Sequence, residues 1–158
     1  MESLSIYLKE QYKLVKASRE ALFDYCYTIS KEDFIKQNTQ FGRGGSIRNL
    51  LVHITTTYQF WIANICLKKV IDYNKFEAVK NISETVELFD AVDNFMNEFF
   101  ENIDSAEEIE YEIDGIKNVT NQFKLFSHVI THEFHHKGQI LSISRQLGYI
   151  PIDTDIMR

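Results

Sequence analysis

Four of the five histidines of this chain lie within nine consecutive residues, at positions 128–136. Two of them, His132 and His136, are four residues apart, so on a helix their Cβ atoms lie about 5–6 Å apart on one face. Two imidazoles placed in this way can bind one metal ion, at Zn–N distances of about 2.0–2.1 Å. The alternative is a pair of core histidines satisfied by hydrogen bonds. The spacing makes His132 and His136 candidate metal ligands.

The residues around this pair follow the spacing of a buried helical stripe. Apolar side chains recur at gaps of three and four on both sides of the histidines, at Leu125, Val129, Ile140, Ile143 and Leu147. Both histidines therefore replace apolar residues in a seam that should face the core, where an unpartnered imidazole costs roughly 2–7 kcal/mol. His135 falls off the seam and is expected to face solvent. His128 and Gln139, beside the seam, could orient the ligands or line the pocket, and the alternative is a surface histidine and a partly exposed glutamine.

A third histidine, His53, lies on the margin of an apolar stripe in another predicted helix, over residues 47–68. Beside a two-histidine site, it is the obvious third ligand. Three imidazoles leave coordination positions open, which is typical of a catalytic rather than a structural metal site. An open position can hold water or a thiolate, or polarise a carbonyl. Imidazole is not selective, so zinc, nickel, iron, manganese and copper all remain possible.

The marginal position of His53 predicts that the site lies in a cleft, with an open coordination position facing solvent. The loop that leads into this helix contains Gly42, Gly44 and Gly45. We expect that loop to form part of the cleft rim and to be more mobile than the helices. It lacks the GxGxxG pattern and the P-loop lysine of phosphate-binding loops.

The run HEFHH at positions 132–136 also matches HExxH, the zincin metalloprotease motif. In a zincin Glu133, which flanks the ligand face, would be the catalytic general base. The context favours this less, because only Asp153 and Asp155 are acidic downstream and no sheet beyond a small hairpin is expected to hold a peptide. A ferritin-like di-iron site needs two Glu-x-x-His helices, and the chain supplies one copy.

Amphipathic helices are predicted over about residues 2–28, 47–68, 81–102 and 120–147. Ser46 is a suitable N-cap for the helix over residues 47–68, and Thr120 for the helix over 120–147. The helix over 81–102 could be capped by Asn81 with Glu84, or by Ser83 alone. A capping box at Ser30 should start a short helical turn, while Gly148 should end the last helix. Residues 108–119 alternate in polarity around Asp114 and Gly115, which predicts a β-hairpin with one acidic, solvated face.

Four helices with single apolar faces indicate an all-α four-helix bundle, with a small β-hairpin before the last helix. The connection at 69–80 is long enough for a crossover, and residues 1–158 suit one domain. The net charge is 17 minus 23, or −6, which argues against nucleic acid or an anionic membrane as partner. With no signal peptide, no spanning segment and two separate cysteines, Cys26 and Cys66, a cytoplasmic protein with reduced thiols is expected.

Three stretches resemble signatures of the DinB/YfiT-like superfamily. GSIRNLLVHI at 45–54, followed by Trp61, resembles its second-helix signature, and HVITHEFHHKGQI at 128–140 resembles its last-helix signature. RQLGYIP at 145–151 and the DTD at 153–155 resemble the usual ending. The resemblance implies a four-helix bundle with a crossover and a divalent metal bound by His53, His132 and His136. Lys137 stands where an arginine is common, and both residues keep the positive charge.

Members of that superfamily include bacillithiol- and mycothiol-dependent transferases and a maleylpyruvate isomerase, and many members are dimers. The resemblance therefore favours a metal-dependent transferase that joins a low-molecular-weight thiol to an electrophile. It would hold one divalent transition metal per chain (Zn, Ni, Fe or Mn) and act as a homodimer, without nucleic acid or membrane as partner. The alternatives are a non-catalytic metal-binding or stress-response bundle protein and, less favoured, the HExxH zinc peptidase with Glu133 as its base.

Overall fold

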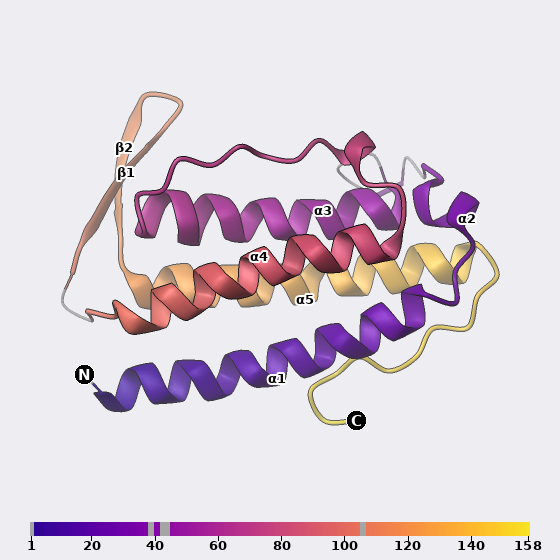
Figure 1. The fold of residues 1–158 in the computed structure, drawn as a ribbon, viewed down its shortest axis with the longest axis horizontal. Coiled ribbons are helices and arrows are strands. Elements are labelled where there is room, and N and C mark those ends of the chain that lie inside the picture. Colours follow the sequence, from indigo (N-terminus) through magenta and orange to yellow (C-terminus); the bar gives the residue numbers. More distant parts are fainter. Residues whose placement is uncertain (1, 38–39, 42–44, 105–106) are drawn as a thin grey trace.

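The computed structural model describes residues 2–37, 40–41, 45–104 and 107–158, and within them the chain forms the predicted helical bundle (Figure 1). The helices are α1 (Glu2–Cys26), the short α2 (Lys31–Ile35), α3 (Ile47–Tyr58), α4 (Ile82–Glu101) and α5 (Gln122–Gln146). The expectation of a mobile rim concerns residues 42–44, which lie outside the described residues. Gly45, which follows them, has a φ of 59° and leads directly into the cap of α3.

The bundle contains the predicted crossover (Figure 1). Helix α1 runs from the hairpin end of the molecule to the opposite end, and α3 returns. The chain then passes back along the outside of α3, through a single 3₁₀ turn at Phe76–Ala78, so that α4 runs parallel to α3 rather than antiparallel. Helix α5 returns alongside α3, and it is the packing of α3 against α5 that brings the histidine-bearing segments together.

The helix predicted over residues 47–68 is not a continuous α-helix. It changes at Gln59 to a π-helix, η1 (Gln59–Cys66), closed by a hydrogen bond from Leu67 N to the carbonyl of Ile62 at 2.9 Å. Lys68, with a φ of 56°, ends it. No glycine or proline in the sequence marks the change. The register is set by tertiary packing, in which Ile62 and Ala63 are fully buried. Turns of this kind are frequent at functional sites.

Side-chain caps fix where the helices begin, and most match the predictions. Ser46 accepts from Asn49 N, Ser30 from Asp33 N and Asn81 from Glu84 N. The predicted cap of the last helix was wrong by one residue: Asn121 caps α5, because Thr120 is the last residue of a strand.

A Schellman motif ends α5, as the glycine after the helix predicted. Gly148 has a φ of 95°, its N–H donates to the carbonyl of Arg145, and the N–H of Tyr149 donates to that of Ser144. These bonds satisfy carbonyls that the end of a helix would otherwise leave unpaired.

The predicted hairpin consists of β1 (Ile109–Ile113) and β2 (Ile116–Thr120), paired antiparallel with Tyr111 opposite Asn118. Asp114 and Gly115 both have positive φ, of 53° and 77°, as a type I′ turn requires. The hairpin stands at one end of the bundle (Figure 1), with its first strand packed against η1.

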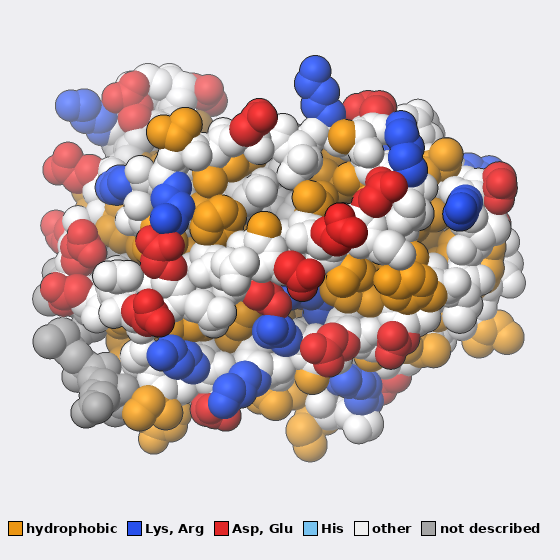
Figure 2. Space-filling model, viewed as in Figure 1, with side chains coloured by type: hydrophobic (Ala, Val, Ile, Leu, Met, Phe, Trp, Pro, Cys, Tyr) orange, Lys and Arg blue, Asp and Glu red, His pale blue; other side chains and the backbone are white. Residues whose placement is uncertain are grey.

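The surface carries no broad region of one charge on the face shown in Figure 2, where acidic and basic side chains are interspersed with apolar ones. Such a face offers no continuous basic stripe for a nucleic-acid backbone. Within the described ranges, no helix is long and apolar enough to cross a membrane.

Candidate metal centre

The structure brings together three histidines, His53 from α3 and His132 and His136 from α5. The ring centroid of His53 lies 4.8 Å from each of the other two, and those two lie 4.3 Å apart. One potential ligand nitrogen from each ring lies within 4.8 Å of the others. The i, i+4 spacing on α5 supplies two of these rings, and the packing of α3 on α5 supplies the third. The group is placed so that it could hold one metal ion.

The two α5 histidines direct their Nε2 atoms toward each other. Nε2 of His136 lies 3.0 Å from Nε2 of His132, while Nδ1 of His136 lies 2.7 Å from Oε1 of Gln139. An amide oxygen accepts only, so Nδ1 of His136 carries the proton and, in the neutral ring, Nε2 keeps its lone pair. Gln139 thus selects the tautomer that a metal ligand needs, the orienting role expected of it.

His132 is held neutral by its surroundings. Burial lowers the pKa of its imidazole from 6.5 to about 3, with further lowering from the neighbouring histidines His136 and His53. Its Nδ1 is buried and has no hydrogen-bond partner among the described residues. A neutral ring whose Nε2 converges with that of His136 fits the donor set of a divalent transition metal, which requires unprotonated nitrogens.

The histidines lie nearer the edge of the helix interface than the predicted seam implied. His136 is 7% exposed and His132 is half-buried, whereas Glu133 and Lys137, the next residues along, are 0% and 1% exposed. The predicted stripe is buried at Leu125, Val129, Ile140 and Ile143, but the buried face is wider than predicted, because the charged pair of Glu133 and Lys137 also faces the core. Of the three histidines, His53 also lines a groove.

That groove has a volume of about 490 Å³, and His53 lines it together with Thr57 and Trp61. It lies between the α3–η1 helix and the crossover segment, which contributes Tyr73 and Phe76. Its position agrees with the cleft expected from the marginal placement of His53. A substrate in this groove would lie directly beside one imidazole of the histidine group.

Glu133 points away from the histidines and into the core. Its Oε1 accepts from Nε of Arg19 at 3.0 Å, and its Oε2 accepts from Nη2 of Arg19 at 2.9 Å and from the hydroxyl of Tyr58 at 2.7 Å. Nζ of Lys137 lies 3.2 Å from Oε1. The Arg19 guanidinium keeps the pKa of Glu133 below its usual value despite complete burial. A carboxylate held by three partners is not placed to act as a general base at the metal.

This buried ionic network extends to α4 and to the carboxyl-terminal segment, and the sequence analysis missed it. Nη1 of Arg19 donates to Asp93 at 2.9 Å. Lys137 donates to the hydroxyl of Ser18, which in turn donates to the carbonyl of Thr154. The available signal was a polar residue, Ser18, on the apolar line of the first helix. A buried hydroxyl there needs polar partners, and Lys137 and the carbonyl of Thr154 supply them.

The remaining histidines lie outside the group of three. His135 is exposed, as predicted, with its Nε2 accepting from the amide of Gln139 at 3.2 Å. His128 is also exposed and packs its ring against Trp61 at 5.3 Å and His132 at 5.6 Å. It therefore contacts one of the three histidines without joining them.

The two cysteines are not activated thiols. Burial raises the pKa of Cys26 to about 12 and that of Cys66 to about 11. Thiolate character is what makes a cysteine nucleophilic, so both are expected to be inert.

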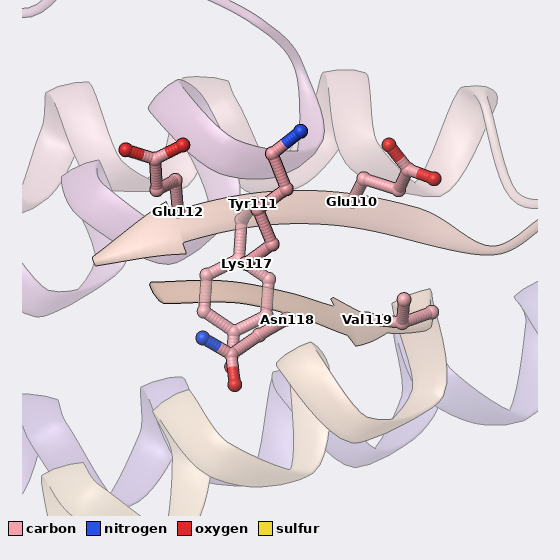
Figure 3. A pocket seen from close by; sticks show the side chains of 6 residues that line it. All are labelled: Glu110, Tyr111, Glu112, Lys117, Asn118 and Val119. Carbon is pink, nitrogen blue, oxygen red and sulfur yellow. The ribbon is translucent and has the colours of Figure 1, made fainter. Parts of the chain in front are cut away.

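A second cavity, of about 400 Å³, lies at the hairpin and is shown in Figure 3. The carboxylates of Glu110 and Glu112 lie on the same side of the strands as the amine of Lys117, while Tyr111 and Asn118 point the other way. Both glutamates are exposed, as expected for the acidic face. Because no histidine lines this cavity, it is separate from the histidine group.

The model of the DinB family matches residues 3–158, nearly the whole chain, so the protein belongs to the DinB family. The chain is also similar to the uncharacterized protein YizA of Bacillus subtilis (strain 168). The two are 26% identical over 149 residues, which cover 88% of this chain and 87% of YizA.

Proposed function

We propose that this DinB-family protein binds one divalent transition metal through His53, His132 and His136. The observation that carries the proposal is the convergence of three ring nitrogens within 4.8 Å, at the edge of a groove. Two features of the chain support it: Gln139 fixes the tautomer of His136, and burial keeps His132 neutral. Zinc, nickel, iron and manganese all accept such a nitrogen set.

We further propose that the protein is an enzyme, a transferase that joins a low-molecular-weight thiol to an electrophile. With three protein ligands, a bound divalent ion would keep an open position at which a thiol ionises near neutral pH. The described residues contribute binding and exclusion of water: Phe60, Trp61 and Phe76 supply apolar walls around the side of the site that His53 faces. Desolvating a sulfur nucleophile and an electrophile together favours their reaction.

The peptidase alternative receives no support from the site. A zincin needs the glutamate of its HExxH motif beside the metal, and here that glutamate is committed to Arg19, Tyr58 and Lys137 in the core. The transferase proposal needs no carboxylate at the site, because a thiol has a lower pKa than water and requires less assistance to ionise.

Cobalt substitution tests the proposed function. Added thiol should give the cobalt-loaded wild type a thiolate-to-cobalt charge-transfer band, and the S-methylated form of the same thiol should not. If the absorption spectrum of the cobalt-loaded protein does not change with thiols, azide or pH, the site is closed and the transferase proposal is refuted. A screen of thiol cosubstrates with electrophilic acceptors should then detect turnover that depends on the metal.

We also propose that residues 1–158 form one domain that assembles as a homodimer. The family match over residues 3–158 supports the first part. For the second, α1 exposes Ile6, Tyr7 and Leu14, at 55%, 73% and 50%. Light scattering coupled to gel filtration should give about twice the chain mass of 18.6 kDa, and a mass of one chain would contradict the dimer.

A further inference from the structure

The groove beside His53 has an unusual lining for a site of its size. One wall comes from α3 and η1 and includes Thr56, Phe60 and Trp61. The facing wall comes from the crossover segment and consists of Tyr73, Asn74 and Phe76. Four of the lining side chains are thus aromatic rings, and among the described residues no Lys, Arg, Asp or Glu lines the groove.

The hydroxyl and amide groups of the groove are neutral, and some of them already form hydrogen bonds. The hydroxyls of Thr56 and Thr57 donate to the carbonyl of His53, at 3.0 Å and 2.9 Å. Each threonine therefore offers the groove its methyl group and an acceptor oxygen, but not its hydroxyl proton. Asn74 adds a neutral amide. In the metal-free protein, a negatively charged group placed here would lose its hydration without gaining a cationic side chain as partner, which is costly.

The lysine in this region that could bind an anion lines another cavity. Lys124 lines a separate space of about 180 Å³, together with His128, on the Tyr111 side of Trp61. Trp61 borders both spaces, and its ring packs edge-on against Phe60 at 4.9 Å and against Tyr111 at 5.3 Å. The groove at His53 is therefore an aromatic compartment without acidic, lysine or arginine side chains, and its volume of about 490 Å³ falls within the range of small-molecule sites.

We infer that this groove binds an uncharged aromatic molecule, and that such molecules are the electrophile class of the protein. Faces and edges of Phe60, Trp61, Tyr73 and Phe76 provide ring contacts on two sides, each worth about 0.5–1.5 kcal/mol beyond the area buried. The crossover supplies one of those sides, so the long connection between α3 and α4 forms part of the substrate site. The aromatic character of the ligand is inferred from the groove alone. Its role as the electrophile rests on the proposed function.

The chain carries its own reporter for this inference, because Trp61 is the only tryptophan. We propose to titrate the metal-free full-length protein with 2,4-dinitrotoluene and, in parallel, with 2,4-dinitrobenzoate, which keeps the ring and nitro groups but adds a negative charge. Nitroaromatic rings quench tryptophan fluorescence on contact. We expect saturable quenching by dinitrotoluene, with a Kd at least about tenfold lower than that for dinitrobenzoate, a difference of about 1.4 kcal/mol.

Two variants and a matched control locate the binding. Tyr73→Ala, which removes an aromatic wall that is 40% exposed, should weaken dinitrotoluene binding about fivefold, or about 1 kcal/mol. Tyr27→Ala, the same change at a position just after α1 that is 54% exposed and outside the groove, should leave the Kd unaltered. Thr56→Lys adds a cation to the lining and should strengthen dinitrobenzoate binding about fivefold.

Two results would overturn the inference: dinitrobenzoate binding as tightly as dinitrotoluene, or quenching that stays linear and unsaturable for both compounds. Neither titration contains a thiol, so its failure is separable from that of the proposed function. Saturable, neutral-selective binding without a cobalt–thiolate band would retain the groove and refute the transferase. A cobalt–thiolate band with turnover of anionic acceptors only would support the transferase and refute the inference that the groove selects uncharged aromatic molecules.

Discussion

Replacing Glu133 by Gln is the substitution for which the structure and the HExxH motif predict different results. The side chain is 0% exposed, accepts three hydrogen bonds, two of them from the guanidinium of Arg19, and forms an ion pair with Lys137. The network contains two buried cations, Arg19 and Lys137, and two carboxylates, the buried Glu133 and the partly buried Asp93, which also pairs with the more exposed Lys16. Glutamine keeps the shape and removes one negative charge, so the network is left with one buried positive charge in excess.

Breaking a buried ion pair by removing one partner costs about 3–5 kcal/mol. The cost should fall near the lower end of that range, because burial lowers the pKa of Lys137 and Glu133 opposes this lowering. Without Glu133, Lys137 can release its proton and remove the excess charge. In a chain of this length, each kcal/mol shifts Tm by about 2–4 °C, so a loss of about 3 kcal/mol corresponds to roughly 6–12 °C.

Urea unfolding and calorimetry of metal-free protein measure this cost. Glu110→Gln, the same change at an exposed hairpin position, is the matched control and should alter stability by less than about 0.5 kcal/mol. The Glu133 variant should still bind metal, since the side chain does not face the histidines. Unchanged stability would show that the network is not formed, and peptide cleavage by wild type that disappears in the variant would support the zincin interpretation instead.

Three further results are expected. Gln139→Leu should lower metal affinity about 10–100-fold in a competition titration, because His136 loses the acceptor that fixes its tautomer, and unchanged affinity would contradict that role. Metal-free protein should lose stability as pH falls below about 6.5: the folded pKa of His132, about 3, is lower than its unfolded value, so the unfolded state binds the proton first. The Tm of His132→Gln should decline less than that of wild type over pH 6.5–4. Parallel curves of Tm against pH for the two proteins would refute this cause. Asn81→Ala should cost about 0.5–2 kcal/mol by urea unfolding, and no change would mean that the cap contributes little.

Much of the fold could be predicted from local sequence. Apolar periodicity gave the long helices, and the turn and capping residues placed most of their ends, including the hairpin turn at Asp114 and Gly115. These signals are local, since each depends on a few neighbouring residues. The π-helix could not be predicted, because its register depends on how buried residues such as Ile62 pack against other helices.

The histidine group could be predicted more fully than its surroundings. An i, i+4 pair on one helix shares a face whatever the rest of the chain does. The third residue, His53, was predicted from its place on the margin of another helix's apolar stripe, and the family resemblance implied the same residue. The role of Glu133 could not be read in the same way. Its partners Arg19, Tyr58 and Lys137 come from three helices, and only the assembled bundle shows that a carboxylate next to a histidine faces the core. The substrate groove likewise depends on where the crossover lies.

Metal content per chain tests the central claim most directly. Protein loaded with a divalent transition metal, desalted and analysed by elemental analysis should carry one ion per chain. His53→Ala, His132→Ala and His136→Ala should each reduce this to a small fraction. His135→Ala is the matched control, because its exposed ring lies on the same helix outside the group, and it should keep nearly full occupancy. Full occupancy in His53→Ala, or a loss in His135→Ala as severe as in the other variants, would contradict the three-histidine site.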